Sequence, residues 1–241
     1  MESINKVVLF RIKHRIIYML DYNGIKFSWI GHDGFRIVGD NSNGDNKTIY
    51  IDPYQVTTTH HDKNDADILL ISHNHFDHLS MNDLKHVISK RTSIIAAQEC
   101  IEQLKGLDVK EIKGVQPGDK LIIQNIPVEI VSAYNINKKF HPKDDNKVGF
   151  IFTLNNQRIY HTGDTDVIPE MKSINPDIAF VPVSGTYVMT AEEAAQAVNE
   201  IIKPKKLAIP MHYGAIVGTQ KDAEIFTDLV KICETKILEQ E

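Results

Sequence analysis

A short histidine-rich segment, residues 72–79 with the sequence SHNHFDHL, constrains the fold of this chain more than any other feature. It directly follows the apolar run at 68–71 (ILLI), which predicts a buried strand. Where a strand ends, alternate side chains such as His73 and His75 can converge on one point, while Asp77 and His78 leave in another direction. Imidazole and carboxylate groups at this spacing indicate a metal site, and the two pairs of side chains could serve two adjacent ions.

Size, charge and cysteine content set limits on the class of protein. With 241 residues, of which 42% are hydrophobic and 24% charged, the chain is long enough to bury a substantial core. Its net charge of -5 gives no global basic field, so no nucleic-acid partner is expected. Cys100 and Cys233 form no metal or redox spacing, which indicates a reducing cytoplasm. No segment is apolar enough to predict a membrane span.

The order of secondary-structure signals predicts hairpins first and alternating strands and helices afterwards. Ser80 and Asp83 mark one helix start, and Thr190 with Glu193 forms a capping box for a helix that ends before Pro204. A last amphipathic helix is expected at about 222–232. The expected strands are 25–30, 35–38, 48–51, 68–71, 93–97, 109–112, 120–123, 128–132, 148–154, 158–161 and 206–209. Two sheets packed together with helices outside would satisfy this order.

Three later positions supply further ligand-type side chains. His141 lies in a loop between strands, Asp164 follows a strand at a glycine turn, and His212 comes just after another strand. A carboxylate at such a turn can bridge two cations. Each position alone is weak, because a histidine or aspartate in a loop is usually just solvated. Together with the first segment they can complete a site for two ions.

These motifs closely resemble the metallo-β-lactamase superfamily. The resemblance covers about Ile25 to the C-terminus and includes His73-x-His75-x-Asp77-His78, Gly163-Asp164-Thr165, the late His212, and Asp52 at an earlier strand end. Within the superfamily, the segments at 29–32 (WIGH), 160–166 (YHTGDTD) and 210–214 (PMHYG) look like the metal-dependent hydrolases near the ascorbate-phosphate lactonases and the N-acyl-phosphatidylethanolamine phospholipases.

The resemblance implies an α+β fold, an αββα sandwich in which two mixed β-sheets pack face to face with helices on the outer faces. The hydrolase domain would span residues 23–241, with residues 1–22 as an N-terminal extension. Basic side chains interrupt the apolar run at 7–20 and no cleavage site follows it, so an extra strand or a loose arm is expected there rather than a signal peptide. Met19 is an alternative initiation site.

The resemblance also implies two divalent metal ions at one edge of the sheets, with zinc preferred over manganese, iron or nickel. One ion would take His73, His75 and His141, the other Asp77, His78 and His212, with Asp164 bridging. His161 is the alternative to His141 as the third ligand of the first ion. Asp52 would lie behind the ligands and steady the histidine loop.

The expected chemistry is hydrolysis of an ester, lactone or phosphoester of a small molecule by a water or hydroxide that bridges the two ions. Asp77 would orient this nucleophile or accept its proton. His161, Tyr187 or Tyr213 could donate to the leaving group or the oxyanion, and a packed role at a strand end is equally open for each of them. His32 is expected near the site, whereas His60 and His61 are expected at its rim or on the surface.

Two other function classes stay open. Nucleases of the same superfamily commonly carry an additional domain or a substrate-gripping arm, and the sequence leaves no room for an inserted domain between His141 and His212. A non-catalytic binding protein that retains the fold is opposed by the intact ligand set. An oxygen-reducing di-iron role is disfavoured, since related flavodiiron proteins have a glutamate where this chain has His75. The expected partner is a small-molecule substrate, and a homo-oligomer remains open.

Overall fold

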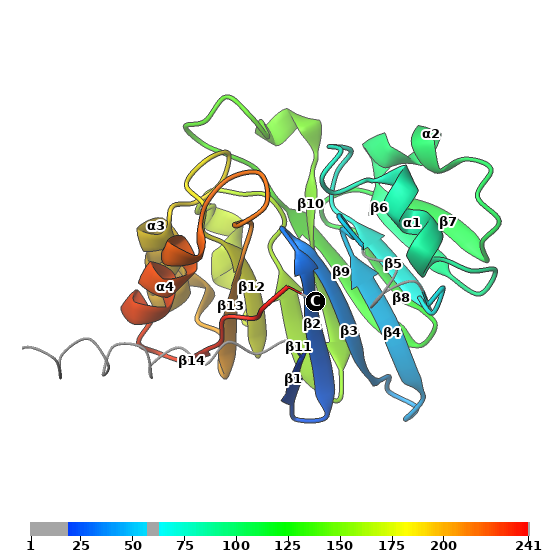
Figure 1. The fold of residues 1–241 in the computed structure, drawn as a ribbon, viewed down its shortest axis with the longest axis horizontal. Coiled ribbons are helices and arrows are strands. Elements are labelled where there is room, and N and C mark those ends of the chain that lie inside the picture. Colours follow the sequence, from blue (N-terminus) through cyan, green and yellow to red (C-terminus); the bar gives the residue numbers. More distant parts are fainter. Residues whose placement is uncertain (1–18, 57–62, 241) are drawn as a thin grey trace, which may run out of the picture.

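The computed structural model describes residues 19–56 and 63–240. Within them the chain folds into two seven-stranded β-sheets that pack against each other (Figure 1). Residues 1–18 of the predicted N-terminal extension at 1–22, and the predicted rim residues His60 and His61, lie outside the described residues.

The first sheet has the strand order β1-β2-β3-β4-β5-β6-β7. Strands β1 to β4 pair antiparallel, and β4 to β7 pair in parallel. Strand β5 is buried at every position, which fits its unbroken apolar run because a parallel strand is covered on both faces. The strands are β1 (Met19–Tyr22), β2 (Ile25–Gly31), β3 (Gly34–Asp40), β4 (Asn46–Ile51), β5 (Ile68–Ile71), β6 (Ser93–Ala97) and β7 (Glu111–Val115).

The second sheet repeats this plan with the order β14-β13-β12-β11-β10-β9-β8. Strands β8 to β11 pair antiparallel, and β11 to β14 pair in parallel. Asn155 and Asn156 close the β10–β11 hairpin with φ of 47° and 57°, the left-handed pair that a two-residue hairpin turn favours. The strands are β8 (Lys120–Ile123), β9 (Ile126–Ser132), β10 (Val148–Leu154), β11 (Gln157–His161), β12 (Ile178–Pro182), β13 (Leu207–Met211) and β14 (Glu234–Thr235).

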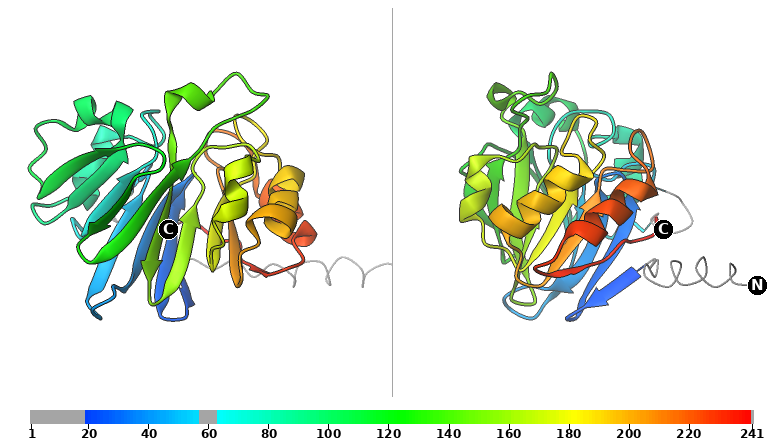
Figure 2. Two further views of the ribbon diagram at one scale, coloured as in Figure 1. Left: turned by 180° about the vertical axis from the view of Figure 1, so that it is seen from behind. Right: turned by 90° about the vertical axis from the view of Figure 1, so that its left-hand side faces the viewer.

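The helices cover the outer faces of the two sheets, so the predicted αββα sandwich is confirmed. Helices α1 (Met81–Val87) and α2 (Ile101–Leu104) lie beside β5 to β7, and α3 (Ala191–Ala197) and α4 (Gln220–Leu229) lie beside β12 and β13 (Figures 1 and 2). Both predicted helix starts are confirmed, since Ser80 accepts from the Asp83 amide and Thr190 forms a capping box with Glu193. Short turns of helix complete the chain: η2 (Gln98–Cys100), η3 (Lys143–Asp145), η4 (Pro169–Ser173) and η5 (Val198–Ile202).

Strand β1 takes Met19–Tyr22 of the predicted extension into the first sheet, where it pairs with β2. The start of the hydrolase domain at residue 23 remains a prediction. The helix that begins after Thr190 changes at Val198 to the wider π-helical η5 before it ends ahead of Pro204. No helix in the described residues is long and apolar enough to cross a membrane.

The core lies between the sheets and is closed by aromatic rings from both. Phe27 on β2 and Phe35 on β3 meet Phe180 on β12, with ring centroids 5.7 Å and 4.4 Å apart. All three rings are fully buried. Such offset and tilted aromatic contacts favour one relative placement of the two sheets, which fixes how their strand ends face each other.

One edge of the sandwich is built by the β2–β3 turn of the first sheet and by loops of the second. The His32 carbonyl oxygen in this turn accepts from Trp29 Nε1 at 2.9 Å and from the His212 amide just beyond β13 at 3.0 Å. His161 Nε2 donates to the Asp33 carbonyl oxygen at 3.1 Å. These bonds join the two sheets where β5, β11 and β13 also end, and so bring residues far apart in sequence to one place.

Gly149 on β10 makes room for the loop that follows β11. A Cβ atom at this position would lie 2.6 Å from the Thr162 carbonyl oxygen and 2.8 Å from the His161 carbonyl oxygen. Since both atoms are backbone, Gly149→Ala should lower the free energy of unfolding by about 1–3 kcal/mol through forced backbone shifts. Urea denaturation measures this change. Thr153→Val on the same strand is the control, and equal stability of the two variants would contradict the prediction.

Candidate metal centre

The histidine-rich loop begins where β5 ends, and hydrogen bonds to the Asp52 carboxylate hold it in place. The Asp52 carboxylate accepts from the Ser72 amide at 2.8 Å, from Ser72 Oγ at 2.5 Å and from His78 Nδ1 at 2.9 Å. With Nδ1 bonded to Asp52, Nε2 is the His78 nitrogen that faces the centre of the loop. The structure therefore places Asp52 behind the loop, where the sequence predicted it, and adds Ser72, which the sequence analysis missed.

The first group of donors consists of His73, His75 and His141. His75 Nδ1 lies 3.0 Å from His73 Nε2 and 3.2 Å from His141 Nε2. The opposite nitrogen of His141, Nδ1, donates to the Tyr187 carbonyl oxygen at 3.2 Å, so Nε2 keeps its lone pair. Of the two predicted candidates for a third ligand, the structure brings His141 and not His161 to this group.

His141 reaches the group from the long loop between β9 and β10, and Asn135 holds this loop. The Asn135 side-chain amide donates to the Phe140 carbonyl oxygen at 2.8 Å and to the Tyr187 carbonyl oxygen at 2.5 Å. Its backbone amide donates to the His141 carbonyl oxygen at 2.8 Å. His141 itself takes a left-handed φ of 57°, a conformation that such surrounding bonds must stabilise. The sequence analysis did not identify Asn135.

Asp164 lies between this first group and a second set of donors. Its Oδ2 atom is 3.4 Å from His141 Nε2 on one side, and 3.5 Å from His78 Nε2 and 3.3 Å from His212 Nε2 on the other. His212 Nδ1 is paired with Ser184 Oγ at 2.8 Å, which again leaves Nε2 for the centre. Asp164 Oδ2 therefore faces donor nitrogens of both groups.

Burial and close charges shift the pKa values of these groups. Burial alone would raise the pKa of Asp164, yet the neighbouring His212 and His78 hold it well below its usual range. Burial would lower the pKa of His78, but the Asp164 and Asp52 carboxylates raise it well above its ordinary value. Burial and the nearby His78 lower the pKa of His73. The site therefore favours an ionised Asp164 and a neutral His73, the forms that bind metal ions, whereas His78 must release its Nε2 proton when it binds one.

Asp77 and His32 form a pair beside the second set of donors, which includes His78 and His212. His32 Nε2 lies 3.1 Å from Asp77 Oδ2. Burial, which outweighs the attraction of Asp77, lowers the pKa of His32 to about 4, so its imidazole is neutral at pH 7. Burial opposes ionisation of Asp77, but the bond from His32 and the nearby His78 lower its pKa to about 2. The structure thus places His32, which the sequence predicted near the site, beside Asp77.

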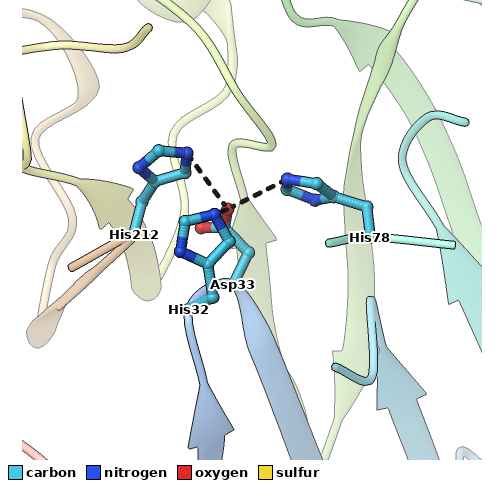
Figure 3. A group of neighbouring side chains, drawn as sticks. All are labelled: His32, Asp33, His78 and His212. Carbon is cyan, nitrogen blue, oxygen red and sulfur yellow. Dashed lines mark ion pairs between the residues drawn. The ribbon is translucent and has the colours of Figure 1, made fainter. Parts of the chain in front are cut away.

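Asp33, the neighbour of His32, is a residue of this centre that the sequence analysis missed. It is fully buried in the β2–β3 turn and directs its carboxylate towards His78 and His212 (Figure 3). Burial and the close Asp164 raise its pKa well above the usual range. The signal that could have found it is the second ligand-type side chain in the tight turn Gly31-His32-Asp33-Gly34.

The other predicted site residues occupy different surroundings. His161 is fully buried, with Nε2 bonded to the Asp33 carbonyl oxygen and Nδ1 accepting from the Gly163 amide at 3.3 Å. Its ring is therefore not placed to protonate a leaving group. Tyr213 is buried and stacks on Trp29 at 4.7 Å between centroids. Tyr187 is half-exposed and lines the cavity above the donors.

That cavity has a volume of about 290 Å³ and opens directly over the donor groups. Its floor is polar and carries Asp77, Asp164 and the ring edges of three histidines. Its wall is apolar, because four large side chains that are partly exposed to solvent stand around it: Phe76, Phe140, Tyr187 and Ile216. None of the described residues that line it is a lysine or an arginine.

The donor atoms fit divalent cations. Within each of the groups His73–His75–His141 and His73–His78–Asp164, the donor atoms all lie within 4.8 Å of one another. His78 Nε2 and Asp164 Oδ1 are buried and have no hydrogen-bond partner among the described residues. Buried polar atoms are normally paired, so these two atoms fit a role as cation ligands better than a role in a packed polar core. Imidazole and carboxylate donors suit zinc and other divalent ions of the first transition row.

Comparison with known proteins agrees with this geometry. The family model of the beta-lactamase superfamily domain matches residues 26–212. A UPF0173 metal-dependent hydrolase of Staphylococcus aureus is 29% identical over 210 residues, which cover 81% of this chain and 90% of that protein. A metal-dependent hydrolase structure from Parabacteroides distasonis is 30% identical, with a TM-score of 0.76, and the match covers 92% of this chain and 98% of that one. A metallo hydrolase from Ignicoccus hospitalis, 21% identical with a TM-score of 0.70 over 90% of this chain and 95% of that one, shares the fold.

Removal of Asp164 tests the donor arrangement directly. Protein purified without chelator should contain close to two metal ions per chain, and Asp164→Ala should contain about one or fewer, because both donor groups lose the carboxylate between them. Elemental analysis by mass spectrometry measures the content. Asp45→Ala in an exposed loop is the control. An Asp164→Ala protein that keeps its full metal content would refute the arrangement.

Proposed function

The chain belongs to the metallo-β-lactamase superfamily and is a metal-dependent hydrolase, and we propose that it uses two divalent ions, preferably zinc, to cleave an ester or lactone bond of a small neutral molecule. The observation that carries the two-ion proposal is the position of Asp164, whose Oδ2 lies 3.4 Å from His141 Nε2 and 3.3 Å from His212 Nε2. One carboxylate oxygen thus faces both donor groups.

In this proposal the ligands divide between two ions. His73, His75 and His141 hold the first, His78 and His212 with Asp77 hold the second, and Asp164 lies between them. When bound, such ions lower the pKa of a coordinated water and polarise the bond to be cleaved. The tautomers of His78, His141 and His212 are already set for this, since each has its other ring nitrogen engaged by Asp52, Tyr187 or Ser184.

Asp77 is the proposed proton acceptor of the reaction. Its pKa of about 2 keeps it ionised at neutral pH, and it lies at the floor of the cavity where a substrate and a water would meet. His32 Nε2 lies 3.1 Å from the Asp77 carboxylate and is the group proposed to orient it. Tyr187 lines the same cavity and is the proposed donor to the substrate. His161 serves in this proposal as a positioning residue that holds the turn at Asp33.

The wall of the cavity favours a substrate with an apolar group over a phosphoester. Phosphate and nucleic acid are normally held by lysine or arginine, and the described lining carries neither. The exposed surface of Phe76, Phe140 and Ile216 can instead cover a hydrocarbon group of the substrate. Carboxylic esters and lactones combine such a group with a carbonyl carbon open to attack. Of the three bonds expected from the sequence, these two are the ones we propose.

The cytoplasm remains the proposed compartment, because Cys100 and Cys233 are both free thiols in the structure. Ordinary cytoplasmic reductants keep such thiols reduced.

A panel of substrates tests the choice of bond. We expect p-nitrophenyl hexanoate and a medium-chain lactone to be cleaved with a higher kcat/KM than bis(p-nitrophenyl) phosphate or structured RNA. Asp77→Asn should lower kcat/KM on the best ester by about 100-fold or more. Preferential cleavage of the phosphodiester or the RNA would contradict the proposed substrate class and favour the nuclease.

The apolar wall has a matched test within the chain. Ile216 lines the cavity and is 40% exposed, whereas Ile232 is 47% exposed and does not line it. Ile216→Ala should lower kcat/KM for the hexanoate about fivefold while the acetate changes little, because only the longer chain reaches the wall. Ile232→Ala should leave both values unchanged. An equal effect of Ile216→Ala on acetate and hexanoate would show that the wall does not bind the acyl chain.

A further inference from the structure

Asp33 is a fully buried carboxylate for which the protein provides no hydrogen-bond donor. Both of its oxygen atoms are buried and without a hydrogen-bond partner within the described protein. Asp52 provides the internal comparison, since it is equally buried and accepts three hydrogen bonds from Ser72 and His78. A carboxylate with a purely structural role in this core is expected to accept hydrogen bonds, as Asp52 does. Asp33 does not follow this pattern.

The Asp33 carboxylate is directed at the nitrogen atoms proposed to hold the second ion. Its Oδ2 atom lies 3.5 Å from His78 Nε2 and 3.9 Å from His212 Nε2 (Figure 3). His32 Nε2 lies 3.9 Å away on a third side. These donor atoms of His32, Asp33, His78 and His212 all lie within 4.8 Å of one another.

These separations are those of ligands around one cation. Two atoms that each bind an ion at about 2.1 Å lie roughly 3.0 Å apart when the bond angle is a right angle and roughly 4.2 Å apart when they are opposite. The distances of 3.5 Å to His78 and 3.9 Å to His212 fall between these limits. They are longer than normal hydrogen bonds, so these ion pairs leave the hydrogen-bonding capacity of the carboxylate unused.

We propose that Asp33 is an additional carboxylate ligand of the second ion, beside His78 and His212. This inference rests on the proposed two-ion site but names a ligand that the superfamily motifs in the sequence did not indicate. With Asp33 the second ion has three carboxylates around it, Asp33, Asp77 and the shared Asp164, whereas the first is held mainly by three imidazoles. An oxygen-rich second position accepts manganese or iron(II) as well as zinc, while the first position favours zinc.

The alternative is that Asp33 is a neutral acid that donates a hydrogen bond within the cluster. Asp33→Asn separates the two roles, because an amide can replace a protonated carboxyl as a donor but cannot supply an anionic ligand. Metal-free wild-type and Asp33→Asn proteins would be titrated with zinc against a chromophoric chelator, with Asp45→Asn as the control. Cobalt(II) absorption spectra of the same proteins report the coordination of each ion without reference to activity.

We expect Asp33→Asn to bind the first zinc like the wild type and the second at least tenfold more weakly, with loss of the cobalt absorption that belongs to the second ion. Binding of both ions with wild-type affinity and unchanged cobalt spectra would overturn the inference. If the wild-type protein binds only one ion, the two-ion proposal is wrong, and this result does not by itself decide the role of Asp33. Weaker binding of that ion by Asp33→Asn would still support Asp33 as a ligand, and unchanged binding would refute it.

Stability of the metal-free protein provides the second readout. A ligand carboxylate without its cation destabilises the folded state, so metal-free Asp33→Asn should have a Tm equal to or above that of the metal-free wild type. Zinc should then raise the Tm of the wild type more than that of the variant. A metal-free variant that is unfolded by circular dichroism, or clearly less stable than the wild type, would show a structural role and overturn the inference.

Discussion

Buried polar atoms without hydrogen-bond partners are the constraint on which the rest of this structure depends. The edge between the two sheets holds imidazoles and carboxylates that are almost completely buried, among them His73, His78, Asp33 and Asp164. Several of their polar atoms have no hydrogen-bond partner among the described residues. Each buried polar atom left unpaired costs about 1–3 kcal/mol, so cations that pair with these atoms would stabilise this edge.

Both sheets position these buried side chains. Each sheet combines an antiparallel meander with parallel strands, and the donors come from the strand ends and turns of both. The His32 carbonyl oxygen accepts from Trp29 Nε1 and from the His212 amide, which fastens a turn of the first sheet to a loop of the second. The tilted rings of Phe35 and Phe180 below set the spacing between the sheets. The core thus determines the distances between ligands that are remote in sequence.

Sequence patterns could predict the sandwich and most donors because strand ends carry strong local signals. His73 and His78 follow an unmistakable buried strand, and Asp164 follows another at a glycine turn. What escaped prediction depends on contacts that are distant in sequence. His161 has a motif context as good as that of Asp164, but its position opposite Phe150 in the β10–β11 pair turns its ring into the core. Asp33 became visible only when the β2–β3 turn was placed against His78, and no short-range pattern reports that contact.

The same loops that complete the metal centre also form the wall of the cavity, and this links specificity to catalysis. Asn135 donates both to the Phe140 carbonyl oxygen, next to the donor His141, and to the Tyr187 carbonyl oxygen. The rings of Phe140 and Tyr187 lie edge to face at 4.6 Å between centroids above the donors. A substrate group that moves these rings must also move the backbone that carries His141. The donor His141 and the apolar wall are therefore held by the same side chain, Asn135, so Asn135 is a residue through which the wall and the donor can be coupled.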